Sequence, residues 1–244
     1  MNKIKVIKQP TKNKPFLVIF KSSGLPSAPI NENDCENALS YAIQLYPQIK
    51  NIKGKKAIEY GLLHRIDTAT EGLLLIALSQ DFYDYMQIEQ SQNRFIKYYK
   101  AQCDIFENTD SSYPLNKNHL KLSEGITFEQ KSFFRNYGIG NKEVRPVTQD
   151  SSKIVQKKVQ NKKEYTTKIT INKIYEKSAE VECEISQGYR HQVRCHLAWS
   201  GLPIKGDEQY NKKAENQLRF SATKLVFEYP RGDLNSYGIA PTWT

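Results

Sequence analysis

Short apolar stretches along this chain predict strands. Residues 16–20 are all apolar and run into a turn that contains Gly and Pro, as expected of a buried strand. Residues 95–104 are also predicted to form a strand. Residues 166–175 and 178–186 alternate between apolar and polar positions, which predicts two half-buried strands. The last strand carries on one face Ala179, Val181, Cys183 and Ile185.

Two further segments show helical spacing. Apolar residues recur every three or four positions over residues 38–45, with Asn33 or Asp34 as the predicted cap. Ser79 is predicted to cap a second helix that ends near Gln90. The strands and few helices lack a regular strand–helix–strand rhythm. The pattern therefore predicts an α+β fold with a mostly antiparallel mixed sheet flanked by helices.

The segment from about residue 105 to residue 163 is polar, studded with aromatic residues and without clear periodicity. It is expected to be an insertion with its own short elements or a mobile loop. Gly138-Ile139-Gly140 within it is predicted to be a turn, because a dinucleotide loop would need a third glycine and a preceding strand. Near its end lie five lysines that form either a solvated face or a phosphate-contacting patch: Lys153, Lys157, Lys158, Lys162 and Lys163.

The composition points to a polyanionic partner. Thirty-six Lys and Arg against 26 Asp and Glu give a net charge of +10, which favours nucleic acid first and an anionic membrane second. No secretory signal is expected at the N-terminus, and the longest apolar run, residues 73–78, is far shorter than the ~20 residues of a membrane span. Four scattered cysteines in a chain of this size predict a reducing, cytoplasmic location.

A metal site is not expected. Cys183, His191, Cys195 and His196 could be imagined around an ion, but no C-x-x-C or H-x-x-x-H spacing supports it. These cysteines are instead expected to be small buried residues.

Asp67 is the strongest candidate for a catalytic residue, judged from the residues that flank it in the sequence. It follows His64-Arg65-Ile66 and stands just before a long apolar run. A carboxylate at the edge of a core is costly unless it is paired or used. It could be a helix or turn cap, or it could act as a base or nucleophile.

A second polar cluster lies at residues 188–197. If a helix begins near Arg190, then Arg190, His191 and Arg194 share one face by their i, i+3 and i+4 spacing. Such a helix would present a small basic face.

These segments resemble, in order and identity, the RluA-type pseudouridine synthases, whose signature is approximately H-R-L-D-x-x-T-S-G-L-L. Residues 64–67 and 70–74 match that signature, and Lys97, Tyr99 and Ala101 match the family's K-x-Y-x-A. The family's H-Q-I-R-x-H-L and G-x-P-I-x-G-D-x-x-Y segments are matched at residues 191–197 and 201–210. The resemblance spans about residues 16–230.

The resemblance implies a pseudouridine synthase fold with a central RNA-binding cleft and no metal or organic cofactor. The reaction would turn uridine in ribosomal or transfer RNA into its C-glycoside isomer, with the target base flipped into the cleft. Residues 1–244 would form a single catalytic domain, with about 105–163 as an inserted or variable segment. The first fifteen residues are too few for a separate RNA-binding domain. The protein is expected to be a monomer without an obligate protein partner.

The resemblance also assigns catalytic roles to three residues. Asp67 matches the family aspartate, Arg194 the arginine that pairs with it, and Tyr99 the tyrosine that lies against the target uracil. Arginine keeps its proton, so it would favour an ionised Asp67. The alternatives are a surface salt bridge for Arg194 and ordinary core packing for Tyr99.

The predicted substrate-binding residues are Arg65, Arg190, His191, Gln192 and Lys97. Arg65 would contact the RNA backbone or fill the gap left by the flipped base, and its alternative is a carboxylate pair within the chain. His64, His191 and His196 are expected to be hydrogen-bonded architecture rather than catalysts.

The sequence departs from the family pattern at three places. Glu71 replaces the usual serine and would oppose ionisation of Asp67 if both faced the pocket, so Glu71 is expected to face another partner. Tyr189-Arg190 replaces R-T or R-S, so a phosphate contact there would move by one position. Residues 21–25 lack the proline of K-P-x-G-L, which loosens a turn.

Two competing hypotheses use the same residues. One is an RNA-binding or assembly factor that has lost activity, and the other is an RNA or DNA glycosylase. Retention of the three catalytic residues argues against the first, and free uracil in the product would favour the second.

Overall fold

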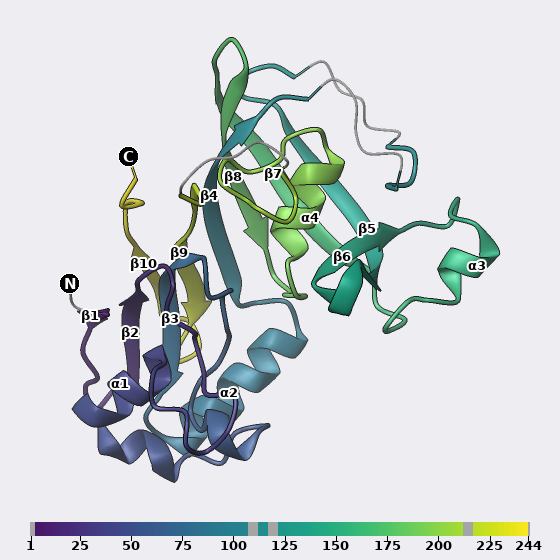
Figure 1. Ribbon diagram of the computed structural model, residues 1–244. Coiled ribbons are helices and arrows are strands. Elements are labelled where there is room, and N and C mark those ends of the chain that lie inside the picture. The colour runs from purple at the N-terminus through teal and green to yellow at the C-terminus, as the bar shows by residue number, and fades with distance from the viewer. Residues whose placement is uncertain (1–2, 107–111, 117–121, 212–216, 244) are drawn as a thin grey trace. The chain divides into compact units, whose positions relative to one another are not determined.

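The computed structural model describes residues 3–106, 112–116, 122–211 and 217–243. The chain divides into two compact units (Figure 1). Unit 1 combines residues 1–98 with residues 221–244, and unit 2 is residues 99–220. Unit 1 is therefore built from two separate stretches of chain, whereas unit 2 is continuous.

Unit 1 contains a sheet in the order β1-β2-β3-β9, with β10 beside β9. Its strands are β1 (Ile4–Lys8), β2 (Phe16–Lys21), β3 (Glu71–Ala77), β9 (Phe220–Glu228) and β10 (Leu234–Gly238). The pairings are antiparallel except that of β3 with β9, which is parallel. β3 is buried along its whole length, as expected of a continuous apolar run covered on both faces.

Two helices and two 3-10 turns complete unit 1: α1 (Ala38–Leu45), α2 (Gln80–Ser91), Pro47–Asn51 and Ala57–Glu59. The Ser79 cap of α2 is confirmed, because its side chain accepts a hydrogen bond from Phe82 N at 3.3 Å. α2 packs with β2 and β9 in an aromatic core in which the Phe16 and Phe82 rings stack at 4.8 Å.

The predicted cap of α1 was wrong. Asn37 caps the helix by accepting a hydrogen bond from Ser40 N at 2.9 Å. Asp34 accepts instead from Ile30 N and Glu36 N, which closes the loop before the helix. Both residue types make good caps, and the local turn decided which one serves.

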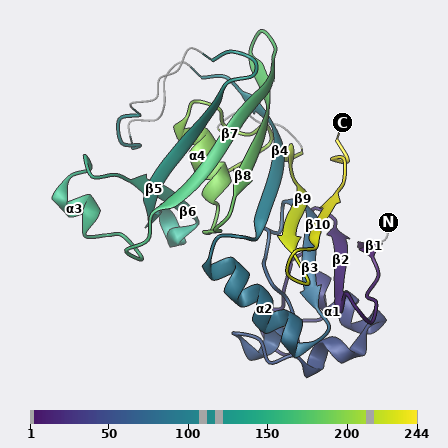
Figure 2. The ribbon, with the colours of Figure 1, turned by 180° about the vertical axis from the view of Figure 1, so that it is seen from behind.

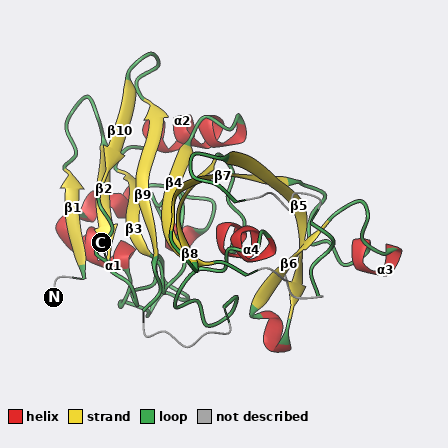
Figure 3. Cartoon of the chain, turned by 90° about the horizontal axis from the view of Figure 1, so that it is seen from above, coloured by secondary structure: helices red, strands yellow, loops and turns green. Residues whose placement is uncertain are grey.

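Unit 2 contains strands in the order β4-β8-β7-β5-β6. Their bounds are β4 (Ile96–Asp104), which leads in from unit 1, β5 (Thr127–Tyr137), β6 (Glu143–Val147), β7 (Tyr165–Ile174) and β8 (Ser178–Ile185). The β5–β6, β5–β7 and β7–β8 pairings are antiparallel. The helices are α3 (Lys153–Gln156) and α4 (Gln192–Trp199), and α4 lies inside the curve of β7, β5 and β6 (Figure 3).

The segment from residue 105 to residue 163 contains regular structure. β5 pairs with β7 and β6 pairs with β5, so the segment supplies two strands of the unit 2 sheet (Figure 2). β5 escaped the sequence pattern because its buried face carries the polar residues Gln130 and Ser132. The predicted turn at Gly138–Gly140 is confirmed as part of the β5–β6 hairpin.

The α+β fold predicted from the sequence is confirmed, and so is the buried face of β8, on which all four apolar residues named above are at most 4% exposed. Among the described residues, no helix is long and apolar enough to cross a membrane. The single catalytic domain of residues 1–244 stays a prediction.

Candidate functional site

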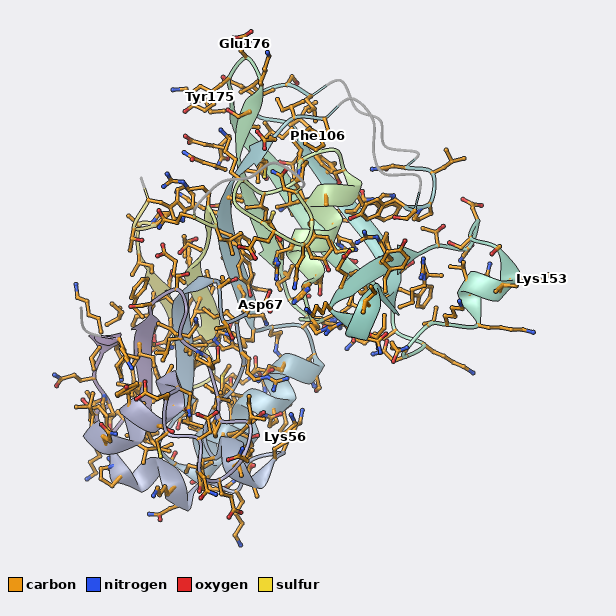
Figure 4. All side chains as sticks on the ribbon, viewed as in Figure 1. Lys56, Asp67, Phe106, Lys153, Tyr175 and Glu176 are labelled. Atoms are coloured by element: carbon orange, nitrogen blue, oxygen red, sulfur yellow. The ribbon has the colours of Figure 1, made fainter. Side chains whose placement is uncertain are left out.

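Asp67 opens a tight turn that leads into β3. Thr70 N donates a hydrogen bond to Asp67 O at 3.0 Å, which closes a four-residue turn with aspartate at its first position. Aspartate is favoured there because its short side chain satisfies nearby backbone groups. Asp67, labelled in Figure 4, is half-buried.

Residues 23–27, which follow β2, hold this turn by hydrogen bonds to the backbone atoms of the turn. Thr68 O accepts from Gly24 N at 2.9 Å, and Ala69 O accepts from the Ser23 hydroxyl at 2.7 Å. The buried Ser27 hydroxyl donates to Ile66 O at 2.7 Å and accepts from Ile66 N at 3.1 Å. The position of Asp67 is therefore set on both sides by contacts to its neighbours' main chain.

Lys21 is the most unusual residue near this turn. Its side chain is 0% exposed, and Nζ donates to Leu25 O at 2.6 Å, Ser22 O at 3.1 Å and Thr68 O at 3.2 Å. Burial lowers the pKa of Lys21 to about 7, although the negative charges of Asp67 and Glu71 raise it. Lys21 matches the lysine of the family's K-P-x-G-L segment, but no role was predicted for it from the sequence.

Glu71 faces another partner, as expected. Its side chain is buried, accepts a hydrogen bond from Thr242 N at 2.8 Å and accepts another from the Thr242 hydroxyl at 2.5 Å. The carboxylate that departs from the family pattern thus anchors the C-terminal segment to the first residue of β3.

Arg65 is more than half exposed and pairs with Glu59, with 3.0 Å between Nη1 and Oε1. The intrachain carboxylate pair weighed for Arg65 therefore exists. Such an exposed pair is weak, which leaves the guanidinium available to RNA, and the RNA contact stays a prediction.

Lys97 and His64 lie together in the interior of unit 1. Lys97 is 5% exposed, its Nζ is 4.4 Å from the Phe95 ring centroid, and burial lowers its pKa to about 7. His64 Nε2 accepts from Leu75 N at 3.2 Å, and burial, with the Lys97 charge, lowers the pKa of His64 to about 3. His64 is therefore neutral and supports β3, whereas substrate binding by Lys97 stays a prediction.

Tyr99 is 7% exposed on β4, and its ring stacks on Phe220 at 5.2 Å with 14° between the planes. The stack fixes the orientation of the tyrosine ring. Contact with a uracil stays a prediction.

Arg194 is held in unit 2 by a buried ion pair. Its Nε and Nη2 donate to the two carboxylate oxygens of Asp207, both at 2.7 Å, and Nη2 also donates to Gln209 Oε1 at 3.0 Å. Arg194 is 6% exposed and Asp207 1% exposed, so the surface salt bridge weighed for Arg194 was wrong. Asp207 is a positioning residue that sequence reasoning missed, although it lies inside a matched family segment. The pairing of Arg194 with Asp67 stays a prediction.

The basic helical face predicted around Arg190 is wrong. α4 begins at Gln192, and His191 adopts a left-handed conformation with φ 54°, so residues 190 and 191 precede the helix. Arg190 donates to the backbone carbonyls of Asn141 and Glu143, whereas Arg194 pairs with Asp207. The positive φ at His191 breaks the spacing on which the predicted face depended.

Gln192 and His196 serve the architecture of α4. The Gln192 amide donates to Thr166 O at 2.9 Å and to the Thr167 hydroxyl at 3.1 Å. The His196 ring is hydrogen-bonded to the hydroxyls of Ser132 at 2.9 Å and Thr167 at 2.8 Å, and burial lowers its pKa to about 3. The expectation for His196 is confirmed, and RNA binding by Gln192 stays a prediction.

His191 is hydrogen-bonded as well, with 3.2 Å between its Nδ1 and the Tyr210 hydroxyl. Its architectural role is thereby confirmed. Binding of RNA by Arg190 and His191 stays a prediction.

In the part of the chain that the structure describes, no group of three or more His, Cys, Asp or Glu residues could hold a metal ion. Cys103, Cys183 and Cys195 are buried, as expected, and Cys35 is exposed. Cys195 donates to Val144 O at 3.4 Å, so its thiol supports the packing of α4 on β6.

Comparison with known proteins gives a consistent match. Residues 15–199 match the family model described as RNA pseudouridylate synthase. The chain is 26% identical over 220 residues to an uncharacterised RNA pseudouridine synthase of Mycoplasma pneumoniae, covering 88% of this chain and 60% of the relative. It is 24% identical over 227 residues to ribosomal large subunit pseudouridine synthase D of Nitrosomonas europaea, covering 93% and 55%. The chain thus spans little more than half the length of these relatives.

Solved structures share the fold. The human RNA Pseudouridylate Synthase Domain Containing 1 superposes with a TM-score of 0.67 at 15% identity, covering 99% of this chain and 84% of the other. The human RNA Pseudouridylate Synthase Domain Containing 4 gives a TM-score of 0.62 at 20% identity, covering 98% and 89%.

Proposed function

The chain belongs to the RNA pseudouridylate synthase family, and we propose that it converts specific uridines of a structured RNA into pseudouridine. The observation that carries the proposal is that the matched residues 15–199 include Asp67, Tyr99 and Arg194. Each of the three is held in place by contacts inside its own unit. A positioned carboxylate, an oriented aromatic ring and a fixed guanidinium are the groups that this isomerisation calls for.

In the proposed reaction the bond between N1 of uracil and the ribose breaks, the base turns, and C5 bonds to the ribose instead. C5 loses a proton and N1 gains one, so the mass of the RNA is unchanged. Asp67 attacks the substrate or abstracts the proton, and Arg194 favours its ionised form. Tyr99 lies against the flipped uracil, and Arg65 contacts the backbone or fills the vacated position in the helix.

We further propose ribosomal RNA as the substrate, with transfer RNA as the alternative, and a cytoplasmic monomer as the active form. The support for ribosomal RNA is that the Nitrosomonas relative is named as an enzyme of the large ribosomal subunit. The net charge of +10 supports an RNA partner of either kind.

The test compares wild type with Asp67→Asn on uridine-containing RNA. Asp67→Asn is expected to lower pseudouridine formation by about 10³-fold or more, because the amide cannot act as base or nucleophile. Asp84→Asn, an exposed aspartate on α2, is the matched control and is expected to retain wild-type rates. Pseudouridine is measured by chemical mapping, and an unchanged RNA mass excludes loss of uracil.

Three results would contradict the proposal. Equal rates for wild type and Asp67→Asn would remove Asp67 from the mechanism. Free uracil would show a glycosylase, and RNA binding without any product would show an assembly factor.

A further inference from the structure

The tip of the β5–β6 hairpin in unit 2 presents an isoleucine to solvent. Ile139 is 95% exposed. Its neighbours Gly138, Gly140 and Asn141 have φ of 77°, 68° and 56°, and Asn141 N donates to Gly138 O at 3.2 Å. Positive φ at residues 138, 140 and 141 is costly for ordinary residues, and here these positions surround one apolar side chain that projects outward.

Two arginines stand directly opposite each other at the base of the same hairpin. Arg135 on β5 pairs in register with Arg145 on β6. Their guanidinium carbons lie 4.8 Å and 4.6 Å from the centroid of one ring, that of Tyr137. Like charges directly opposite each other destabilise a strand pair, so this arrangement calls for a negative partner.

Glu143, the carboxylate beside these arginines, does not neutralise the positive charge of the hairpin. Glu143 pairs with Arg145 at 2.6 Å, and Arg135 Nε is buried without a hydrogen-bond partner in the described part of the chain. Lys142 is exposed at the tip, and Arg190 docks on the backbone carbonyls of residues 141 and 143. Four cationic side chains therefore meet one carboxylate around an apolar tip.

We propose that the β5–β6 hairpin is an RNA-binding element. Arg135 and Lys142 contact backbone phosphates, and Ile139 packs against an unpaired or unstacked base. Arg145 is buried behind them and held by Glu143, so it adds positive charge without touching the RNA. Proteins bind distorted nucleic acid with an apolar side chain flanked by cationic ones. The cationic side chains contact phosphates, and the apolar side chain inserts between bases. The inference rests on the proposed function for its choice of RNA as partner.

The first test measures affinity for a hairpin RNA with an unpaired loop by fluorescence anisotropy. Ile139→Ser is expected to weaken binding about fivefold to tenfold, because it removes the apolar wedge without changing the charge. Ile154→Ser is the matched control, since Ile154 is 72% exposed on α3 in the same unit, and its affinity is expected to equal that of wild type. Equal losses in both variants, or no loss in either, would overturn the wedge.

The second test measures the salt dependence of the same binding. Lys142→Gln is expected to reduce the slope of log K against log salt by about 0.7 to 0.9, the value for one phosphate contact. Lys173→Gln, at an exposed lysine of β7 in the same unit, is the control and is expected to leave the slope unchanged. Equal slopes for wild type and Lys142→Gln would overturn the phosphate contact.

These binding measurements do not depend on catalysis. Absence of pseudouridine from wild-type reactions would contradict the proposed function. The ratio of the affinities of Ile139→Ser and Ile154→Ser would still decide whether the hairpin binds RNA. An acidic peptide bound as tightly as RNA, and weakened equally by Ile139→Ser, would show a protein partner instead and overturn the proposal.

Discussion

The two units hold their candidate catalytic residues by different means. In unit 1, the side chains of Lys21 and Ser27 donate hydrogen bonds to backbone carbonyls of the turn that carries Asp67, and Asp67 itself is half-buried. In unit 2, the side chain of Arg194 is itself fixed, by a buried ion pair with Asp207. The turn of the candidate catalytic aspartate is thus held through its backbone atoms, whereas the candidate arginine is held through its own side chain.

Each unit carries one of the two tryptophans, which allows the comparison to be measured. Trp199 lies in unit 2 and Trp243 in unit 1. Trp243→Phe leaves fluorescence from unit 2 alone, and Trp199→Phe leaves fluorescence from unit 1 alone. Urea unfolding of these two backgrounds then assigns each loss of stability to one unit.

The largest effect is expected from Asp207→Asn. Removing one partner of a buried ion pair leaves the Arg194 charge without compensation, which costs about 3–5 kcal/mol in the free energy of unfolding. Urea unfolding followed by Trp199 measures the loss. Glu184→Gln is the control, because the exposed pair of Glu184 with Lys168 is worth less than about 1 kcal/mol. A loss from Asp207→Asn as small as the control's would show that the ion pair does not fix Arg194.

Lys21→Met is expected to have the next largest effect. The variant removes the donor from the carbonyls of Ser22, Leu25 and Thr68, and buried acceptors without donors cost about 2–3 kcal/mol in total. A loosened turn misplaces Asp67, so pseudouridine formation is expected to fall about 10- to 100-fold. Urea unfolding followed by Trp243 and the rate of product formation measure the two effects.

Lys8→Met is the matched control for Lys21→Met. The half-buried Lys8 also donates to two carbonyls, those of Lys14 at 2.9 Å and Phe16 at 3.1 Å. Its loss is expected to lower the stability of unit 1 without slowing product formation. If Lys21→Met destabilised unit 1 but kept the wild-type rate, backbone support of the turn would not matter for catalysis.

The smallest effect is expected from pH, through His196 in unit 2. Its pKa is about 3 in the folded protein and about 6.5 when unfolded, so the unfolded state binds the proton first as the pH falls. Stability is therefore expected to fall by about 2 kcal/mol between pH 7 and pH 5 from this group. His196→Gln removes that dependence, and unfolding of the Trp199-only protein at both pH values measures the difference. Parallel curves for wild type and His196→Gln would contradict the buried neutral imidazole.

Local signals in the sequence were enough to predict several elements of the fold. Ser79 caps α2 as predicted, because a serine before an apolar periodic segment satisfies the helix N-terminus by itself. The alternation at Ala179, Val181 and Cys183 gave the buried face of β8, because side chains of a strand alternate whatever the partner strand is.

Other features depend on contacts between distant parts of the chain. The left-handed conformation of His191 is uncommon for a residue other than glycine, and it moves the start of α4 to Gln192. Lysine is a residue type that usually lies at the surface. The burial of Lys21 depends on the backbone carbonyls that accept hydrogen bonds from its amine. Asp207 lies thirteen residues from Arg194, and local periodicity says nothing of that pairing.

The parallel pairing of β3 with β9 sets an order on the formation of unit 1 during synthesis. Gly72 lies opposite Ala222, and Glu71 opposite Ser221, so the strand that follows the Asp67 turn obtains this neighbour only after all of unit 2 has left the ribosome. Until then β3 has β2 on one side and an unpaired edge on the other, within a strand whose residues are all buried in the finished protein. The nascent chain therefore carries an aggregation-prone edge next to its candidate catalytic aspartate for as long as residues 99–220 take to be translated.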